Sequence, residues 1–358
     1  MTTRAAGAQQ PQPEDGAHGF APEQRAGLAK PLSQVVGELS MSAWALTALG
    51  CADEVGLLDE LGEPRSLDVL ASRTGVPAAL VEAVLEVLLA MGLVRRDGTV
   101  FLAEPALAVS LTGPARELLR ADLRSHLLQS AQLIDSARRG VLSIGWRHTD
   151  PQILQAQGTR SSAIATAWVD HVFPGLDGLS LDAPEARFLD VGTGVAAIAI
   201  AVCRRFPGLR AVGLDPWAPA LAEARSNVET ARLGDRITLW DSRIEELTDD
   251  AVFDLVHVPA LFLAAEHVRT GLGRVRTALK PGGWVLLQVP EEPGPGITPA
   301  VLRLWCVLWA GDASMSPARV EQMLAHTDYE DIRTFPPLPG PPVRYVVGRR
   351  PPGRDARR

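Results

Sequence analysis

The sequence predicts a mixed α/β fold preceded by a mainly helical domain, and three observations carry this prediction. The apolar run Phe188–Val191 is followed by a glycine-rich turn, an apolar segment and a second apolar run that stops at Asp215. From Arg187 onward, short apolar runs of strand length alternate with helical patterns. Before this point the patterns are helical, apart from one hairpin. Strands that alternate with helices in this way form a Rossmann-like parallel sheet.

Size and composition limit the class of protein. A chain of 358 residues with 46% hydrophobic side chains can form two domains with substantial cores. The net charge of -7 argues against nucleic acid as a partner, because binding phosphates needs a basic surface. The scattered cysteines lack metal-ligand or redox spacing, which favours a reduced, cytoplasmic protein. Residues 1–20 and 351–358 are expected to be tails, the first of them disordered and without the apolar core of a signal peptide. No segment is expected to span a membrane.

The N-terminal domain is expected over residues 21–112. Apolar spacing and the punctuating residues Ser66, Gly75 and Gly92 predict four helices. These helices cover Leu32–Leu49, Cys51–Leu61, Ser66–Arg73 and Pro77–Met91. A hairpin with a two-residue turn at Asp97-Gly98 follows. Helices followed by a hairpin in this order make a winged helix.

A DNA-binding role for this winged helix is disfavoured by charge. Its predicted recognition helix carries Glu82 and Glu86 and no basic residue, so it would meet phosphates with the wrong sign. We therefore favour a module that dimerises and covers a pocket.

Residues 113–180 are predicted to connect the two domains. A long helix is expected over Pro114–Arg139, ahead of a segment rich in aromatic residues and histidines. Within this segment His171 follows Asp170, and a neighbouring carboxylate can fix the tautomer of an imidazole and raise its basicity. His171 is therefore a candidate general base.

The C-terminal domain is expected over residues 181–350. Its strands are predicted at Phe188–Val191, Leu209–Leu214, Arg236–Trp240, Phe253–Val258, Trp284–Val289, Asp331–Phe335 and Val343–Gly348. The run Lys280-Pro-Gly-Gly283 is expected to form a tight turn before the fifth strand.

The segment Asp190-Val-Gly192-Thr-Gly194 predicts a nucleoside site. The glycines let the backbone approach a ligand closely. A dinucleotide site would place a third glycine where Ala197 stands, and the charge of Asp190 suits an ammonium or sulfonium group better than a phosphate. Asp215, at the end of the next strand, can accept hydrogen bonds from both ribose hydroxyls.

This Asp-x-Gly-x-Gly pattern resembles motif I of class I S-adenosylmethionine-dependent methyltransferases. From about residue 30 onward the chain also resembles the winged-helix small-molecule O-methyltransferases. The resemblance implies a seven-stranded sheet whose last strand is antiparallel, S-adenosylmethionine as cofactor, a homodimer formed by the N-terminal domain and a small-molecule acceptor. It also implies that the segment 113–180 closes the acceptor pocket and that Asp241, with Ser242, meets the adenine amino group. Trp217 could stack on adenine or pack at a helix start, and Pro259 is expected beside the cofactor.

The usual general base of these enzymes is missing. The resemblance places that histidine near Leu261, where this chain reads Ala-Leu-Phe-Leu-Ala. His171 and His267 are the candidate replacements, whereas His257 fits a core histidine better. Alternatively no base is needed, since holding an acceptor about 3 Å from a sulfonium methyl can supply several kcal/mol of the barrier.

The sequence therefore predicts an enzyme that transfers a methyl group from S-adenosylmethionine to O, N or C of a small, aromatic metabolite, without a metal. One alternative uses the sulfonium charge for rearrangement or decarboxylation, and another is a ligand- or DNA-binding regulator. Trp305 and Trp309 share a helical face and could line the pocket or pack in the core. His126 and His326 are expected to be peripheral.

Overall fold

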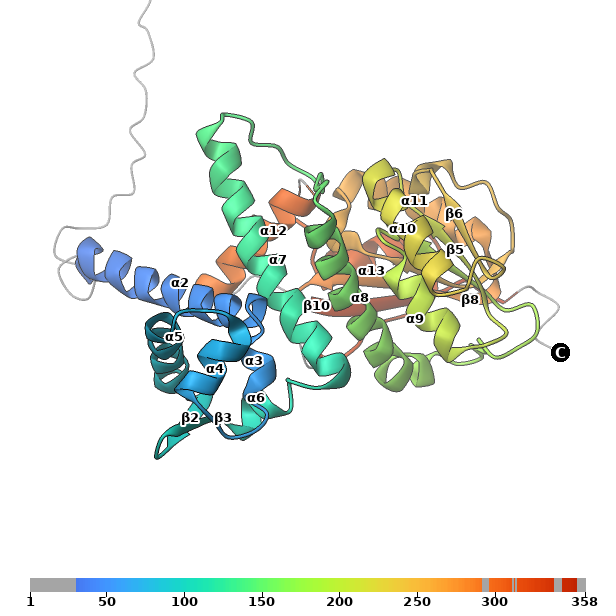
Figure 1. The fold of residues 1–358 in the computed structure, drawn as a ribbon. Coiled ribbons are helices and arrows are strands. Elements are labelled where there is room, and N and C mark those ends of the chain that lie inside the picture. Colours follow the sequence, from blue (N-terminus) through green and yellow to red (C-terminus); the bar gives the residue numbers. More distant parts are fainter. Residues whose placement is uncertain (1–29, 292–295, 311, 313, 338–342, 353–358) are drawn as a thin grey trace, which may run out of the picture.

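The computed structural model describes residues 30–291, 296–310, 312, 314–337 and 343–352. It has a small N-terminal domain joined by two long helices to an α/β domain (Figure 1), which confirms the predicted fold class. The predicted tail at 1–20 lies outside the described residues, as does the tail at 351–358 beyond Pro352.

The N-terminal domain packs helices against a three-stranded sheet with strand order β1-β3-β2. Its helices are α2 (Leu32–Glu54), α3 (Leu57–Glu60), α4 (Leu67–Thr74), α5 (Ala78–Ala90) and α6 (Pro105–Ala108). Its strands are β1 (Arg65–Ser66), β2 (Val94–Asp97) and β3 (Val100–Ala103). The core consists of leucines that are fully shielded from solvent, among them Leu58, Leu61, Leu70, Leu85 and Leu88.

The first helix is longer than predicted, because Gly50 does not end it. Helix α2 continues to Glu54, and the chain breaks at Gly56, whose φ of 75° lies in the left-handed region. A Cβ at Gly50 would collide with the side chain of Leu127 on α7. Gly50 therefore serves close helix packing, and Gly56 makes the turn.

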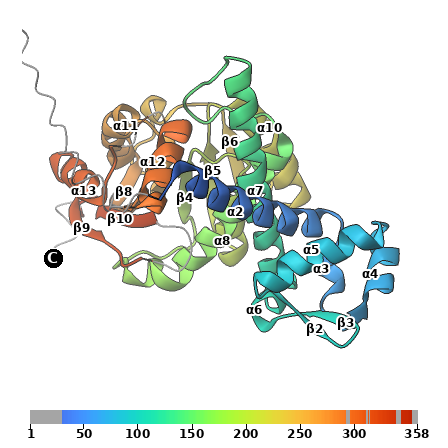
Figure 2. The same ribbon diagram turned by 90° about the vertical axis from the view of Figure 1, so that its left-hand side faces the viewer.

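Helix α2 carries large apolar side chains that face solvent, and it projects from the domain (Figures 1 and 2). The exposed fractions of Leu39, Met41 and Trp44 are 60%, 66% and 70%. Contrary to the expectation from sequence, this 23-residue helix is long and apolar enough to cross a membrane, with a mean hydropathy of 1.3 over 18 residues. Length and composition alone are weak evidence for a membrane span. The apolar face is left without a partner within the described part of one chain.

Two long helices connect the domains, α7 (Gly113–Arg138) and α8 (Pro151–His171). Ion pairs fix the start of α7 to the N-terminal domain: Arg116 contacts the buried Asp53, and its Nε lies 2.6 Å from Oδ1 of Asp59. Helix α8 packs on the α/β domain, where Gly158 lets it approach Val195 so closely that a Cβ would collide.

The α/β domain contains a seven-stranded sheet of order β6-β5-β4-β7-β8-β10-β9. Its strands are β4 (Arg187–Val191), β5 (Arg210–Leu214), β6 (Ile237–Trp240), β7 (Phe253–Val258), β8 (Leu279–Pro290), β9 (Glu330–Thr334) and β10 (Val343–Arg349). The first five strands in this order are parallel, whereas β10 is antiparallel to both its neighbours. The sheet that the resemblance implied is therefore present.

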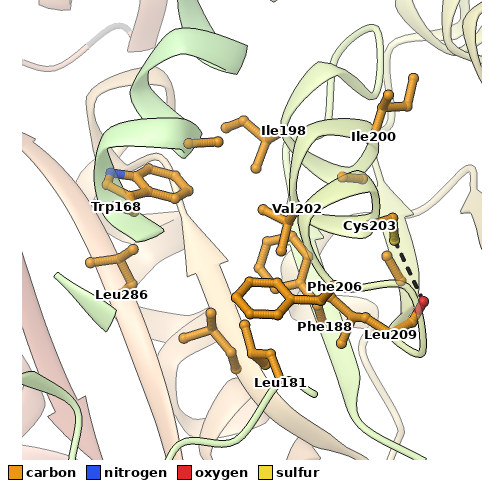
Figure 3. Packing of buried hydrophobic residues seen from close by; sticks show 14 of the residues in the cluster. Trp168, Leu181, Phe188, Ile198, Ile200, Val202, Cys203, Phe206, Leu209 and Leu286 are labelled. Atoms are coloured by element: carbon orange, nitrogen blue, oxygen red, sulfur yellow. Dashed lines mark hydrogen bonds between the residues drawn. The ribbon is translucent and has the colours of Figure 1, made fainter. Parts of the chain in front are cut away.

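Helices cover both faces of this sheet. Helices α8, α9 (Ala197–Arg205) and α10 (Ala218–Thr230) bury one face, and α11 (Ala265–Ala278) and α13 (Pro317–His326) bury the other. Figure 3 shows the first of these layers, in which Trp168 of α8 and Ile198 and Val202 of α9 pack on sheet residues such as Leu286. Short 3-10 turns at Phe173–Gly175, Ile244–Glu246 and Ala260–Phe262 and helix α12 (Ile297–Ala310) complete the domain.

The segment Lys280–Gly283 forms a bulge inside β8, where the sequence predicted a turn before the strand. Phe253 of β7 pairs with Leu279, but Leu255 pairs with Trp284, so the register shifts between them. A Cβ at Gly283 would lie 3.0 Å from the carbonyl oxygen of Lys280 and about as close to backbone oxygens of β7. Only glycine fits there without displacement of the chain.

Candidate active site

The glycine turn after β4 has the geometry that the sequence predicted. Gly192 and Gly194 adopt left-handed φ values of 60° and 58°. A Cβ at Gly192 would lie 3.2 Å from Cγ of Pro259, which follows β7. The turn and the end of β7 are thus in contact, because residue 192 has no side chain.

The carboxylate of Asp215 is hydrogen-bonded to this turn. Its Oδ2 accepts a hydrogen bond from the backbone N–H of Gly194, and its Oδ1 accepts one from the N–H of Trp217, both at 2.8 Å. The side chain is buried, which raises the pKa of Asp215 against the opposing effect of these two bonds. Each oxygen retains a lone pair for a ligand hydroxyl.

Asp190 lies beneath the turn and does not line the cavity above it. Its Oδ2 accepts a hydrogen bond from the Thr193 hydroxyl at 2.8 Å, and its Oδ1 lies 2.8 Å from Nδ1 of His257. Asp190 and His257 are direct partners in the register of β4 and β7. Asp190 therefore holds the turn and orients the imidazole of His257. The sequence predicted instead that Asp190 lies beside the ligand.

A cavity of about 520 Å³ lies above the turn, at the carboxyl ends of the parallel strands. This is the edge at which open α/β sheets bind ligands. Of the residues predicted from sequence, the cavity gathers Gly192, Gly194, Asp215, Trp217, Pro259 and His267. We call it the cofactor cavity.

The other predicted residues do not line this cavity. Asp241 and Ser242 follow β6 at the edge of the sheet, where the Ser242 hydroxyl donates to Oε2 of Glu246 at 2.9 Å. His171 is exposed at the far end of α8, and Asp170 lines a groove against α9. The structure therefore does not bring His171 to the site. Successive residues of a helix do not face each other, so Asp170 and His171 diverge.

His267 reaches the cavity at the end nearest to β6. Its Nδ1 contacts Oε1 of Glu245, in the short turn that follows β6, and Arg243 lines the same end. His257 reaches the floor of the cavity, but the residue is only 1% exposed, and its Nε2 has no hydrogen-bond partner among the described residues.

A second cavity, of about 450 Å³, adjoins the first and was not predicted as a unit. Helix α7, the segment before α8 and helix α12 form its walls. Gly145, Arg147 and Trp309 line both cavities, so the two spaces are neighbours. We call the second cavity the aromatic chamber.

The aromatic chamber has a wall of stacked rings. His126 stacks on Trp305 at 5.1 Å between ring centroids, Trp305 on Trp309 at 5.5 Å, and Trp309 on Phe262 at 4.9 Å. Phe262 lines the cofactor cavity, so the wall runs from one space into the other. The expectation that His126 is peripheral is wrong, and Trp305 and Trp309 line a pocket. In the sequence, only the helical spacing of the two tryptophans indicated this pocket.

Comparison with known proteins finds similarity to methyltransferases. Residues 188–283 match a family model described as a methyltransferase domain. The chain is 26% identical to a mitomycin biosynthesis 6-O-methyltransferase of Streptomyces lavendulae over 337 residues, 88% of this chain and 94% of that protein.

Solved structures share the fold. The apo structure of a S-adenosylmethionine-dependent methyltransferase, SibL, has a TM-score of 0.66 at 22% identity and covers 90% of this chain and 100% of its own. A mitomycin 7-O-methyltransferase has a TM-score of 0.63 at 24% identity and covers 92% of this chain and 100% of its own.

The sheet order, the glycine turn with its buried carboxylate and these matches define a class I S-adenosylmethionine-dependent methyltransferase. S-adenosylmethionine is the methyl donor of this enzyme. Within the described ranges, no group of three or more His, Cys, Asp or Glu side chains could hold a metal ion.

Proposed function

We propose that this enzyme methylates O, N or C of a small aromatic acceptor of the secondary-metabolite type. The observation that carries the proposal is the aromatic chamber, which adjoins the cofactor cavity across Gly145, Arg147 and Trp309. A planar acceptor can stack against this wall of rings, since offset ring stacking is favourable by about 0.5–1.5 kcal/mol beyond burial. The similarity to an O-methyltransferase of mitomycin biosynthesis supports the same acceptor type.

The donor fits the residues of the cofactor cavity. We propose that the carboxylate of Asp215 accepts hydrogen bonds from both ribose hydroxyls, because each of its oxygens keeps a free lone pair beside the cavity. The backbone of Gly192 and Gly194 contacts the aminoacyl part, Trp217 packs against the adenosine, and Pro259 borders the methyl group. These four residues line the cavity with Asp215.

The adenine end of the donor lies toward β6 in this proposal. Asp241 and Ser242 follow that strand next to the cavity-lining Arg243, and we propose that the adenine amino group reaches them beyond the cavity lining. His267 closes the same end with Glu245. His267 is therefore assigned to the donor, at a distance from the acceptor chamber that it does not line.

The bound donor supplies a methyl group on a positively charged sulfur. The protein holds the donor at the turn, stacks the acceptor on the wall of rings and excludes water from the space between them. Positioning of this kind can account for about 7–11 kcal/mol of a barrier. An acceptor atom with an available lone pair can then attack the methyl carbon.

We further propose that the N-terminal domain is a winged helix through which two copies of this cytoplasmic enzyme associate. The exposed apolar face of α2, with Leu39, Met41 and Trp44, supports this proposal, because monomers rarely expose such a face. Trp44→Asp should convert a dimer into a monomer in light scattering coupled to gel filtration. A wild-type protein that is monomeric in buffer and binds lipid vesicles through α2 would contradict the dimer.

The first experiment is calorimetric titration of the purified protein with S-adenosylmethionine, with NAD as a control. Binding of the former alone, followed by formation of S-adenosylhomocysteine and a methylated product from a panel of phenols, amines and indoles, is the expected result. Turnover without S-adenosylhomocysteine would identify the rearrangement or decarboxylation chemistry. A gel shift with DNA at physiological salt, without donor binding, would favour a regulator.

A further inference from the structure

The aromatic chamber contains an imidazole whose chemical state is fixed by its neighbours. Nδ1 of His148 lies 2.5 Å from Oε1 of Gln132 on α7. An amide oxygen only accepts hydrogen bonds, so Nδ1 carries the proton and donates it. Nε2 of His148 therefore keeps its lone pair, and no hydrogen bond joins this atom to another of the described residues.

Neighbouring groups also hold the backbone and ring of His148 in place. The indole N–H of Trp217 donates a hydrogen bond to the carbonyl oxygen of His148 at 2.8 Å. The ring of Trp146 meets the imidazole edge to face at 4.5 Å. Trp217 and Trp146 both line the cofactor cavity, whereas His148 lines the aromatic chamber. His148 thus sits in the wall between donor and acceptor.

The imidazole of His148 is suited to receive a proton. Burial lowers its pKa, against the smaller opposing effect of Asp150. The charged groups of its own segment are Asp150 and Arg147. The groups that contact it from α7 and from the residue before α10 are the uncharged Gln132 and Trp217. The neutral form therefore prevails at physiological pH, and a neutral imidazole is the form that acts as a base.

The other histidines near the two cavities are less suited. Asp190 holds Nδ1 of His257 much as Gln132 holds that of His148, but His257 is 1% exposed, lies under Trp168 and does not line the aromatic chamber. His267 contacts Glu245 at the adenosine end of the proposed donor site. His126 lies flat on Trp305, and no hydrogen bond within the described chain fixes its tautomer.

We propose that His148 is the general base of this enzyme and that the acceptor is a planar aromatic ring with a hydroxyl group. This inference rests on the proposed function and deepens it. The acceptor lies against Trp305 and Trp309 with its hydroxyl directed at Nε2 of His148. Gln132 is a positioning residue that keeps the proton on Nδ1.

The proposed step balances in atoms and charge. The hydroxyl proton moves to Nε2 of His148 as a lone pair of the acceptor oxygen attacks the methyl carbon. The carbon–sulfur bond of the donor breaks, and its electron pair remains on sulfur. The products are a methyl ether, S-adenosylhomocysteine and an imidazolium, which returns its proton to water. This base replaces the histidine that the sequence lacks near Leu261.

The test uses 2-naphthol as the acceptor probe with the full-length protein. Binding of the probe is followed by quenching of tryptophan fluorescence, and turnover by formation of 2-methoxynaphthalene. His148→Gln should keep the affinities for donor and probe within about twofold and lower kcat by roughly 10²-fold or more, since general base catalysis contributes 10²–10⁴-fold. The remaining activity should rise steadily with pH, because solution hydroxide replaces the base.

Further variants separate catalysis from structure. Gln132→Leu should also lower kcat, and Gln132→Glu, which retains an acceptor for Nδ1, should restore much of it. His126→Ala tests the other imidazole that lines the chamber, and His326→Ala, at an exposed histidine, is the matched control with unchanged kcat. Melting temperatures show whether each variant is folded.

Several results would overturn the inference. One is an unchanged kcat in His148→Gln. Another is a fall in kcat in His126→Ala, with remaining activity that rises with pH, as expected for loss of the base. A third is a wild-type protein that binds S-adenosylmethionine but not 2-naphthol. In each of these cases methyl transfer itself would stand. A wild-type protein that does not bind S-adenosylmethionine would instead refute the proposed function.

Discussion

Replacement of Asp215 should weaken donor binding by an amount that its hydrogen bonds set. In the proposed complex the carboxylate accepts two ribose hydroxyls in addition to the N–H groups of Gly194 and Trp217. A hydrogen bond to a charged group contributes about 1.5–3 kcal/mol, so two of them amount to roughly 3–6 kcal/mol. With about 1.4 kcal/mol for each factor of ten, Asp215→Ala should raise Kd for S-adenosylmethionine by roughly 10²- to 10⁴-fold.

Asp215→Asn is the sharper variant, because its shape is unchanged. Its amide has one oxygen, so either Gly194 or Trp217 must face an NH₂ group and lose its acceptor. The expected rise in Kd is about 10- to 100-fold, smaller than for alanine. Calorimetric titration measures both variants, and Asp68→Ala, an exposed aspartate on α4, is the matched control.

The result that would refute this reasoning is specific. If folded Asp215→Ala bound S-adenosylmethionine within twofold of the wild-type affinity, the carboxylate would not contact the ribose. Its two backbone bonds would then serve only the conformation of the turn. Loss of thermal stability without loss of affinity would point to the same conclusion.

Further predictions concern pH, stability and thiol chemistry. Burial raises the pKa of Asp215, and the ionised form binds the donor, so the affinity for S-adenosylmethionine should be full above that pKa and fall as pH drops through it. The fall should come at a higher pH than the titration of an exposed aspartate. Titrations at decreasing pH test this, with Asp215→Asn as the pH-insensitive control. Asp53→Ala leaves the buried Arg116 with Asp59 alone of its two carboxylate partners and should lower the free energy of unfolding by about 1–3 kcal/mol. Urea unfolding measures this loss, and a loss below about 0.5 kcal/mol would contradict the role of the Asp53–Arg116 pair. Iodoacetamide should alkylate the exposed Cys51 first, because burial raises the pKa of Cys203 to about 11. Peptide mapping that found Cys203 modified first in the native protein would contradict its burial.

The strands of the α/β domain were predictable because each is a short apolar run bounded by turn residues. The predicted and observed limits of Phe253–Val258 are the same. Features that depend on distant neighbours were not predictable. Gly50 reads as a helix stop until Leu127 of α7 is placed against it, and the bulge at Lys280–Gly283 needs the register of β7.

The residues of the candidate site also divide into those that the sequence predicted and those that depend on distant neighbours. The donor residues from Gly192 to Asp215 lie close together in sequence and follow from one motif. The acceptor chamber joins His126 to Trp305 and Gln132 to His148, and such pairings follow only from the packing of α7, α12 and the segment between α7 and α8. His171 was favoured for its sequence neighbour Asp170, although helix geometry turns the two side chains apart.

The hydrogen bond from the Trp217 indole to the carbonyl of His148 has a consequence for kinetics. It ties the strand end that carries Asp215 to the wall of the aromatic chamber. A donor that fixes Trp217 also orders this wall, so we expect the donor to bind first and the acceptor second. By thermodynamic linkage the acceptor must then tighten donor binding by the same factor. The methylated product should leave before S-adenosylhomocysteine. The S-adenosylhomocysteine that remains in the cofactor cavity should compete with the donor and inhibit the enzyme.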